Sequence, residues 1–542
     1  MKIINVVFAF LVFCCCFGLN AQQNKYYAVY FKDKGIIDYQ IDNVLSTKAL
    51  ALRAKNNIAI DEKDYFVCKD YLEVLDKAGC ELLMTSRWLN CAVVKTYDNI
   101  EKIRESPFVK SIQIIDIEDE SDVNYDKNDI CYNNVSSKTD FLSYTESYTD
   151  TQLKIVNADC LHTAGFWGEG ITIAVLDDGF KYADRMRVFN HLFDNEQIIA
   201  TYNLVNDDNI YETGEHGSYV LSVLAGYKHG EFMGAAPNAD YLLFKTEDNT
   251  QETILEEFTW VCAAEIADAY GVDIISSSLN YTEMDEQGQS HAYSDMDGNT
   301  CPVSIGASVA ASRGILVVNS AGNYGSTAWK YIGAPADAFD IIAVGGINSD
   351  STHWHSSAYG PSYDGRVKPE ICCLSANVVV ANVANGYSTT NGTSFATPLI
   401  AGACACLLQA FPHKTAADIR NAVLSYSNMY NAPNSELGFG IPDFYKSYCQ
   451  ILSLPEKNRV ESLALIYPNP VIDNFRIISS VDIDKIYIYN VNGKLLNSEQ
   501  HRNTDKDVAI FVDNCSAEML MIVYIVFIDG RSVTKKVVVA EL

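Results

Sequence analysis

The feature that most constrains this chain is a serine placed where a glycine turn opens into a helix of small residues. Residues 391–399 read NGTSFATPL and continue as IAGACA to residue 405. A helix N-terminus presents unpaired backbone N–H groups and the positive end of the helix dipole, which together stabilise an oxyanion. Ser394 is therefore a candidate nucleophile, provided that the chain also supplies a base and an acid to orient that base.

Two other segments supply those groups. Residues 171–179 read ITIAVLDDG, the pattern of a buried parallel strand with Asp177 at its carboxyl end. Catalytic groups of open α/β sheets gather at that edge. His216 begins the run HGSYVLSVLAG, whose apolar residues have helical spacing and whose last glycine is a helix stop signal. Asp177, His216 and Ser394 thus follow one another as acid, base and nucleophile.

A fourth segment offers a donor for the oxyanion. Residues 315–325 read ILVVNSAGNYG, an apolar strand that runs into a glycine-flanked turn. The side-chain amide of Asn323 can donate to a developing oxyanion, and one such donor contributes about 2.7–4 kcal/mol. Taken alone, each of the four segments is also an ordinary strand end, helix cap or turn.

In sequence and in order, these four segments resemble those of the subtilisin-like serine proteases, the subtilases. The order Asp, His, Ser is that of subtilisin. The resemblance covers roughly residues 151–450. It also includes the segments IISSSLN at 274–280, VKPE at 367–370 and GFGIPD at 438–443.

The resemblance implies a mechanism and a fold. His216, oriented by Asp177, takes the proton of Ser394, whose oxygen attacks a peptide carbonyl to form an acyl-enzyme. Asn323 and the Ser394 backbone N–H receive the oxyanion. The implied fold is α/β, a mostly parallel sheet with flanking helices. The strand that lines the substrate pocket places four residues against the substrate: Ser276, Ser277, Ser278 and Leu279.

The chain departs from the family pattern at three places. Asp178 stands where the family usually has Ser or Thr, which leaves Asp178 as an alternative acid, although the strand register favours Asp177. Ser218 replaces the usual Thr and keeps a hydroxyl. Residues 371–375 read ICCLS where the family tends to have Ala-Pro-Gly. This departure concerns the neighbouring loop and none of the triad residues.

The N-terminus indicates export. Residues 1–21 have a charged start, a short apolar core and a small residue before the exit, the pattern of a signal peptide. The alternative is a lipoprotein signal at the cysteines of residues 14–16, but Phe13 stands where a small residue is wanted. The predicted location is secreted or at the cell surface, by way of the periplasm.

The net charge, an acidic loop and the cysteine count indicate which partners, metal ions and disulfides to expect. The formal net charge is −29, which argues against a nucleic-acid partner. The implied chemistry needs no cofactor. Structural calcium is common in the family, and residues 295–299 (DMDGN) are an oxygen-rich candidate, but the absence of a full EF-hand pattern favours a solvated acidic loop. The chain has 16 cysteines, three of them in the signal. The remaining odd number cannot all pair within one chain, and Cys404 and Cys406 are predicted to be packing residues.

Residues 22–150 are predicted to be a propeptide and linker. The pattern strand, helix, two strands, helix, strand over residues 26–115 is ferredoxin-like. Subtilase propeptides are similar, which implies an inhibitor of the chain's own active site, with cleavage near residues 115–150. A non-inhibitory accessory domain is the alternative.

Residues 151–452 are predicted to be the catalytic domain, with strands alternating with helices. Residues 460–542 read as short alternating strands with an Asn492-Gly493 hairpin, which predicts a small β-sandwich. This segment resembles the C-terminal sorting domain of type IX secretion cargo and implies that secretion machinery as a partner. A β-sandwich that binds substrate or carbohydrate is the alternative.

Two functions follow from the sequence. The first is a secreted endopeptidase acting on proteins or peptides. The second is a catalytically dead subtilase fold that binds peptides or serves as a scaffold. The residue types at all four catalytic positions favour the first. A lipase-like hydrolase is disfavoured because the Gly-x-Ser-x-Gly elbow is absent around Ser394.

Overall fold

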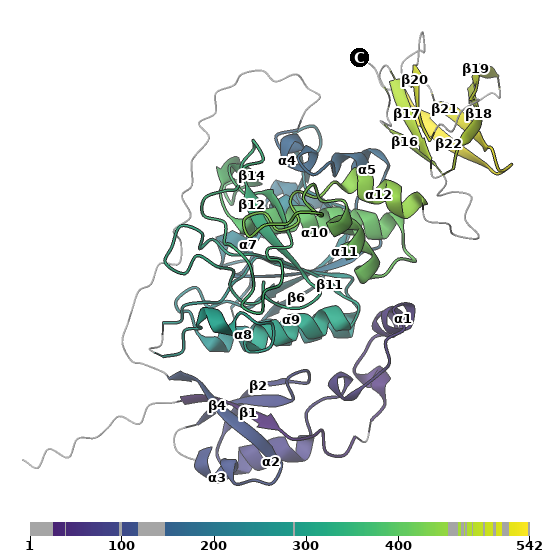
Figure 1. Cartoon of the computed structure of the whole chain (residues 1–542). Coiled ribbons are helices and arrows are strands. Elements are labelled where there is room, and N and C mark those ends of the chain that lie inside the picture. Colours follow the sequence, from purple (N-terminus) through teal and green to yellow (C-terminus); the bar gives the residue numbers. More distant parts are fainter. Residues whose placement is uncertain are drawn as a thin grey trace, which may run out of the picture.

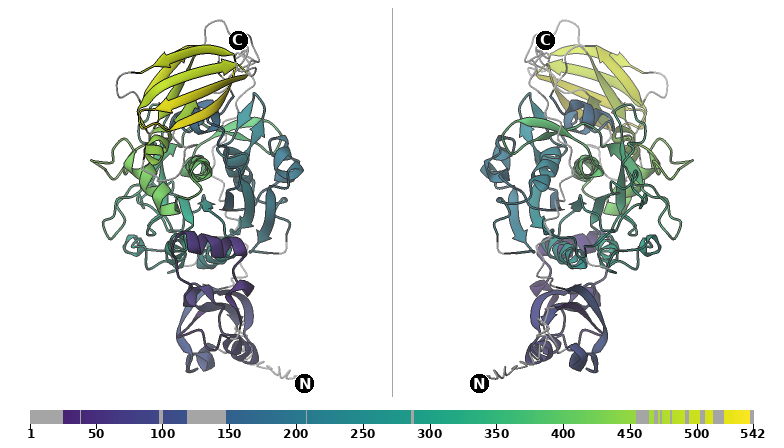
Figure 2. Two further views of the ribbon diagram at one scale, coloured as in Figure 1. Left: turned by 90° about the vertical axis from the view of Figure 1, so that its right-hand side faces the viewer. Right: turned by 90° about the vertical axis from the view of Figure 1, so that its left-hand side faces the viewer.

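The computed structural model describes residues 25–117, 147–453 and 464–539. Short gaps fall at 38, 97–99, 207, 286–287, 468–470, 472–473, 480, 491–493, 502–505 and 512–519. The predicted signal peptide, most of the predicted linker and the Asn492-Gly493 turn lie outside the described residues. Figures 1 and 2 show three units in a row, with the α/β unit between a small N-terminal unit and a C-terminal β unit.

The middle unit is built on a seven-stranded sheet in the order β13-β12-β11-β10-β5-β9-β6, in which all neighbours run parallel. Strand β5 is buried throughout, and its alternate residues face two cores, because successive side chains of a strand point to opposite faces. The strands are β5 (Thr172–Asp177), β6 (Ile198–Asn203), β9 (Asp240–Lys245), β10 (Ile274–Ser277), β11 (Leu316–Ser320), β12 (Ile342–Ile347) and β13 (Ile371–Leu374).

Helices cover both faces of this sheet, which confirms the predicted α/β class. The core on one face includes α7 (Glu215–Ala225), α10 (Thr393–Ala410), α11 (Ala416–Ser425) and α12 (Phe444–Ser453). The core on the other includes α8 (Ile254–Tyr270) and α9 (Pro302–Ser312). By length and composition α10 could cross a membrane, but 89% of it is buried inside the protein, as expected of a central core helix.

Shorter elements complete the middle unit. They are α4 (Asp150–Lys154), α5 (Asp159–Thr163), α6 (Asn190–Asp194), β7 (Tyr227–Lys228), β8 (Phe232–Met233), β14 (Val378–Ala381), β15 (Tyr387–Thr390), and the 3₁₀ turns η3 (Ala183–Arg185), η4 (Arg187–Phe189) and η5 (Tyr293–Asp295).

The N-terminal unit has the predicted ferredoxin-like order. Its four strands pair antiparallel in the order β2-β3-β1-β4 and pack against two helices. The elements are β1 (Lys25–Phe31), α2 (Lys69–Lys77), β2 (Glu81–Ser86), β3 (Cys91–Thr96), α3 (Ile100–Arg104) and β4 (Val109–Ile117).

Between β1 and α2 the chain makes an excursion that the sequence did not predict. It contains η1 (Ile41–Asn43), α1 (Thr47–Lys55) and η2 (Glu62–Asp64). Figure 2 shows α1 apart from the small sheet, lying against the middle unit. Ser46 caps α1 through Ala49 N, and its own backbone N–H donates to the Ala269 carbonyl near the end of α8. The excursion therefore makes its own contacts with the middle unit, in addition to those of the small sheet.

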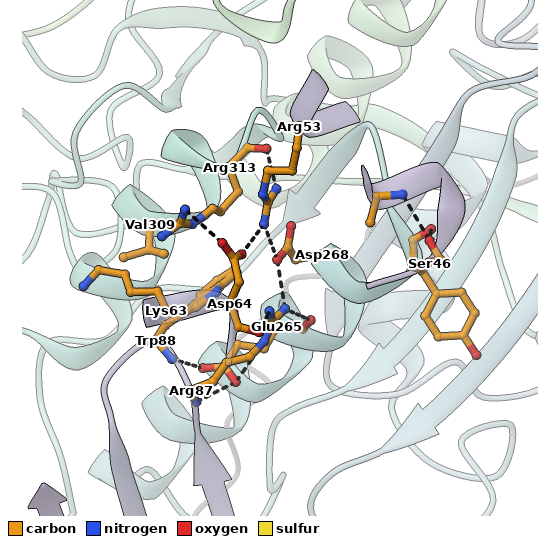
Figure 3. A network of polar contacts seen from close by, with 12 residues as sticks. Ser46, Arg53, Lys63, Asp64, Arg87, Trp88, Glu265, Asp268, Val309 and Arg313 are labelled. Atoms are coloured by element: carbon orange, nitrogen blue, oxygen red, sulfur yellow. Dashed lines mark hydrogen bonds and ion pairs between the residues drawn. The ribbon is translucent and has the colours of Figure 1, made fainter. Parts of the chain in front are cut away.

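A buried charge network joins the two units (Figure 3). The Arg53 guanidinium lies 2.9 Å from Asp64 and 2.8 Å from Asp268 on α8. Arg87 reaches the same Asp268 carboxylate at 2.8 Å, and its backbone N–H donates to Glu265. Arg53 also donates to the carbonyl of Arg313, where α9 ends. Arg53 and Arg87 both pair with Asp268 across the boundary, so the N-terminal unit fits this face closely.

The C-terminal unit consists of two antiparallel sheets around one core, as predicted. One sheet has the order β16-β17-β20 and the other β19-β18-β21-β22. Only Ile478 of this unit joins the buried core of the middle unit among the described residues. The strands are β16 (Ala464–Tyr467), β17 (Asn474–Ser479), β18 (Ile483–Asn490), β19 (Leu495–Gln500), β20 (Asp507–Phe511), β21 (Leu520–Phe527) and β22 (Ser532–Val538).

All eleven cysteines of the described residues are free thiols. Cys404 and Cys406 are fully buried on α10, and burial raises the pKa of both thiols, so they are packing residues as predicted.

Candidate functional site

A cavity of about 260 Å³ opens where β5, β10 and β11 end. This is the carboxyl edge of the sheet, where ligands of open α/β folds bind. Residues from segments far apart in the chain converge there. The lining residues are Asp178, His216, Glu247, Asn249, Glu252, Ser278, Leu279, Asn280, Ser320, Gly322, Asn323, Tyr324, Thr393 and Ser394.

The structure brings His216 to Asp177. Nδ1 of His216 lies 2.7 Å from Oδ1 of Asp177, which is fully buried at the end of β5. Burial opposes a charge on His216, but the Asp177 carboxylate outweighs it, and the net effect raises the pKa of His216 to about 9. Asp178 instead accepts from the backbone N–H of Gly217 at 3.0 Å. The contact to His216 is thus made by Asp177, the residue that the strand register favours.

Gly217 lets the histidine helix approach the aspartate strand. A Cβ at this position would collide with the Gly179 carbonyl and lie 3.0 Å from the Asp177 Cβ. Only a residue without a side chain fits here. The glycine after His216 therefore allows α7 to pack close to the end of β5. Ser218 fixes the same turn from the other side, since its hydroxyl donates to the Lys181 carbonyl at 2.7 Å.

Ser394 is held by a reciprocal pair of hydrogen bonds with Ser278. The Ser394 hydroxyl donates to the Ser278 carbonyl at 3.3 Å, and the Ser278 hydroxyl donates to the Ser394 carbonyl at 2.8 Å. That carbonyl lacks its usual helical donor because Pro398, four residues further along α10, has no N–H. The proline after the serine motif therefore creates the acceptor through which Ser278 positions Ser394.

His216 and Ser394 line the same cavity. Among the contacts of these two described residues, no hydrogen bond joins the serine hydroxyl to the imidazole. The hydroxyl must turn from Ser278 to Nε2 of His216 before a proton can pass, an adjustment common when no substrate is bound.

Asn323 is oriented for donation. Its side-chain oxygen accepts from both the backbone N–H and the hydroxyl of Thr393, at 3.0 and 2.9 Å. With the oxygen fixed in this way, the amide nitrogen is left to face the cavity, which Asn323 lines beside Ser394.

The four predicted substrate-contacting residues divide into two pairs. Ser278 and Leu279 line the cavity. Ser276 and Ser277 lie within β10 and are fully buried, and the Ser277 hydroxyl accepts from the Trp260 indole at 2.9 Å. Among the described residues the structure therefore brings Ser278 and Leu279 to the cavity but not Ser276 and Ser277, which face the core instead. Sequence reasoning missed four lining residues: Glu247, Glu252, Asn280 and Tyr324. Asn280 and Tyr324 lie in recognised segments but were not assigned to the site, whereas the segments around Glu247 and Glu252 carry no recognisable motif.

In the candidate calcium loop, residues 295–299, the carboxylates accept hydrogen bonds from nearby backbone groups. Asp297 accepts from the backbone N–H groups of Asn299 and Thr300, and Asp295 accepts from that of Ala292. These carboxylates cap the turns of their own loop, and a calcium ion there stays a prediction.

A second group, the buried Glu257 and Cys301 with the partly buried His291, forms a chain of hydrogen bonds. Nε2 of His291 lies 2.6 Å from Glu257, and Nδ1 lies 3.6 Å from the Cys301 sulfur. The two ring nitrogens face opposite partners, so one ion cannot contact all three groups unless the ring turns.

A parallel sheet that brings an aspartate, a histidine and a helix-borne serine to one cavity is an arrangement of the serine-hydrolase class. The sequence model of the subtilase family matches residues 168–440, half of the chain, and the chain belongs to this family. The Bacteroidota peptidase S8 propeptide domain matches residues 26–129, and the secretion system C-terminal sorting domain matches residues 465–540. The recognition of all three parts from sequence is thereby confirmed.

Several curated proteins are similar to the middle unit. Subtilisin NAT of Bacillus subtilis subsp. natto is 28% identical over 276 residues, which is 50% of this chain and 64% of that protein. Subtilisin-like protease SBT6.1 of Arabidopsis thaliana is 27% identical over 309 residues, 54% of this chain and 27% of that protein. The chain thus spans between about a quarter and two thirds of the length of these relatives.

Among solved structures, the crystal structure of MycP1 from the ESX-1 type VII secretion system is similar, with a TM-score of 0.43 and 17% identity. The match covers 59% of this chain and 89% of that one.

Proposed function

We propose that this chain is a secreted serine endopeptidase with Asp177, His216 and Ser394 as its catalytic triad. The observation that carries the proposal is the 2.7 Å contact between His216 and Asp177 in a cavity that Ser394 also lines. No cofactor takes part in the proposed reaction.

The proposed reaction follows from the positions of these atoms. Nε2 of His216 takes the Ser394 proton as Oγ attacks the substrate carbonyl carbon, while Nδ1–H stays bonded to Asp177. The oxyanion receives the Asn323 amide and the backbone N–H of Ser394 at the start of α10. His216 then protonates the leaving amine. In the second half of the reaction His216 takes a proton from water, which attacks the acyl-enzyme, and then returns the proton to Ser394 as the acyl group leaves.

Fluorophosphonate labelling together with cleavage of a mixed peptide library tests this proposal. The secreted protein is expected to label at Ser394 and to cleave peptides, whereas Ser394→Ala does neither. Ser425→Ala, which removes an exposed hydroxyl on α11, serves as a matched control with normal labelling. If the wild type is properly processed yet neither labels nor cleaves, the chain is a peptide-binding fold and not an enzyme.

We further propose that residues 22–150 act as an inhibitory propeptide and linker, residues 151–452 as the catalytic domain, and residues 460–542 as a signal read by type IX secretion machinery. The buried docking of the N-terminal unit supports the first assignment. Export through the periplasm to the surface or medium follows from the signal peptide and the sorting domain. Mass-spectrometric sequencing of the active form tests the propeptide: the mature N-terminus is expected near residues 115–150, and finding Gln22 would contradict it.

A further inference from the structure

The charged side chains that line the cavity, His216 apart, are all carboxylates. They are Asp178, Glu247 and Glu252, and no Lys or Arg lines the cavity among the described residues. The buried Lys245 interacts electrostatically with Asp178 and Glu247, but it does not line the cavity, and its ammonium donates to the main-chain carbonyl of Glu247. The cavity next to Ser394 is therefore rich in hydrogen-bond acceptors and poor in positive charge.

Glu247 is built into the floor of this cavity. The residue is 6% exposed, and one carboxylate oxygen accepts from the Tyr281 hydroxyl at 2.6 Å and from the Thr246 hydroxyl at 3.0 Å. Both donors are neutral, so they fix the carboxylate without cancelling its charge. Carboxylate oxygens of Glu247, Glu252 and Glu256 lie within 4.8 Å of one another, a crowding of negative charge that a cation would relieve.

Asn280 supplies an independent sign that the cavity takes a donor. Its amide nitrogen donates to the carbonyls of Ser320 at 2.9 Å and Leu279 at 2.5 Å, which fixes the amide orientation. The amide oxygen is buried and has no hydrogen-bond partner among the described residues. It lies beside Gly322 and Gly333, 3.1 Å from where a Cβ on either would stand. A buried acceptor without a donor carries an unfavourable desolvation free energy. A substrate group that donates to it removes this penalty and therefore binds more tightly.

We propose that this cavity selects peptides with a Lys or Arg side chain next to the scissile bond, and that Glu247 is the residue that determines this specificity. The inference rests on the proposed peptidase function. An ammonium or guanidinium group has donors only, so it matches both the carboxylates and the Asn280 oxygen. An acidic side chain meets repulsion in this cavity, and an apolar one neither offsets the negative charge nor donates to the Asn280 oxygen.

Pairs of peptides that differ only in the presence of a side-chain ammonium group test the specificity. At each of the two positions on the amino side of the cleaved bond, Lys is compared with norleucine, which keeps the stem and lacks the ammonium. At one of these positions the processed wild-type enzyme is expected to prefer Lys on the order of 100-fold in kcat/KM. Glu247→Gln keeps the shape of the side chain and removes its charge, so the Lys/norleucine ratio should fall roughly tenfold. Asp350→Asn, a fully exposed carboxylate elsewhere, should leave the ratio unchanged.

The outcomes separate this inference from the proposed function, because fluorophosphonate labels Ser394 without using the substrate side chain. Labelling with equal cleavage of both peptides, or with a preference for norleucine, overturns the specificity and leaves the peptidase standing. An unchanged ratio in Glu247→Gln overturns the role of Glu247. If that variant is not secreted, Glu252→Gln and the salt dependence of the wild-type ratio take its place, and a ratio insensitive to both contradicts the proposal. Absence of labelling removes the peptidase function and this inference with it.

Discussion

Burial and nearby carboxylates act on the pKa of His216 in opposite directions, and in the proposed mechanism that pKa sets the pH at which Ser394 can react. Burial disfavours the imidazolium, whereas Asp177, and to a smaller extent Asp178, favour it. The result is a pKa raised from 6.5 to about 9. Since only the neutral imidazole can take a proton, a raised pKa moves the onset of activity to higher pH.

Asp177→Asn is expected to lower kcat by about 10⁴-fold, because the amide can hold the wrong tautomer of His216 and cannot stabilise the imidazolium. Steady-state kinetics on a cleaved peptide measure the loss, with circular dichroism as a check that the fold is intact. Asp178→Asn is the matched control, since its neighbour keeps the contact to His216. A larger loss in Asp178→Asn than in Asp177→Asn would mean that Asp178 is the triad acid.

The pH profile of kcat/KM gives a second prediction. In the wild type, activity should be lost as pH falls below the raised pKa of His216, so the acid limb lies above the ordinary histidine value of 6.5. Burial and the Asp177 charge raise the pKa of Asp178 to about 7, and ionised Asp178 adds to the pKa of His216. Asp178→Asn removes that contribution, so its acid limb should move to lower pH. A limb that stays in place or moves up would contradict this electrostatic account.

Sequence reasoning reached the residues of this site by their segments but not their mutual contacts. Asp177 could be predicted because an apolar strand ends at it, and Ser394 because a glycine turn precedes its helix. The bond from the Ser278 hydroxyl to the Ser394 carbonyl could not, since it depends on a carbonyl freed by Pro398 and on two elements distant in sequence. Glu247 was missed for the same reason: its donor Tyr281 comes from another strand end.

At the scale of elements, burial decides which parts of the fold were predictable. The fully buried strands gave continuous apolar runs, and β5, β9, β10, β11 and β12 were all expected. Strand β6 was missed because it lies at the sheet edge with half-exposed side chains, which weakens the apolar pattern. Strand β13, four buried residues that read ICCL, was also missed. The excursion with α1 has few buried residues of its own, so its place is set by contacts with α8 and α9 that no local pattern encodes.

Arg53→Met should loosen the N-terminal unit. The change leaves Asp64 and Asp268 buried with less compensation, and breaking one partner of a buried pair costs about 3–5 kcal/mol, here softened because Arg87 also reaches Asp268. In the full chain carrying Ser394→Ala, limited proteolysis between residues 117 and 147 followed by size exclusion measures whether the two parts remain together. The parts should co-elute when Arg53 is present and separate more readily without it.

Lys77→Met is the matched control for that experiment, because Lys77 forms an exposed pair with Glu73 on α2 and makes no contact across the boundary. If Arg53→Met co-elutes as fully as this control, the buried network does not hold the units together. In that case the apolar contacts of the small sheet carry the docking.

At the scale of the whole molecule, the C-terminal unit is nearly independent of the middle unit. It has its own core between two sheets, and only Ile478 joins the neighbouring core among the described residues. Removing residues 460–542 should therefore leave the fold of the middle unit intact while it removes the matched sorting domain. Folding and export are thus expected to separate cleanly in one truncated chain.

The expected result is a truncated protein that remains in the periplasm and still labels with fluorophosphonate once its propeptide is cut. Cell fractionation with the probe measures location and integrity together, which distinguishes failed sorting from failed folding. The full-length chain with Ser498→Ala, an exposed change on β19, controls for expression of the intact C-terminal unit. A truncated protein that labels on the cell surface or in the medium would mean that residues 460–542 are not the export signal. The substrate-binding β-sandwich would then be the better account of this unit.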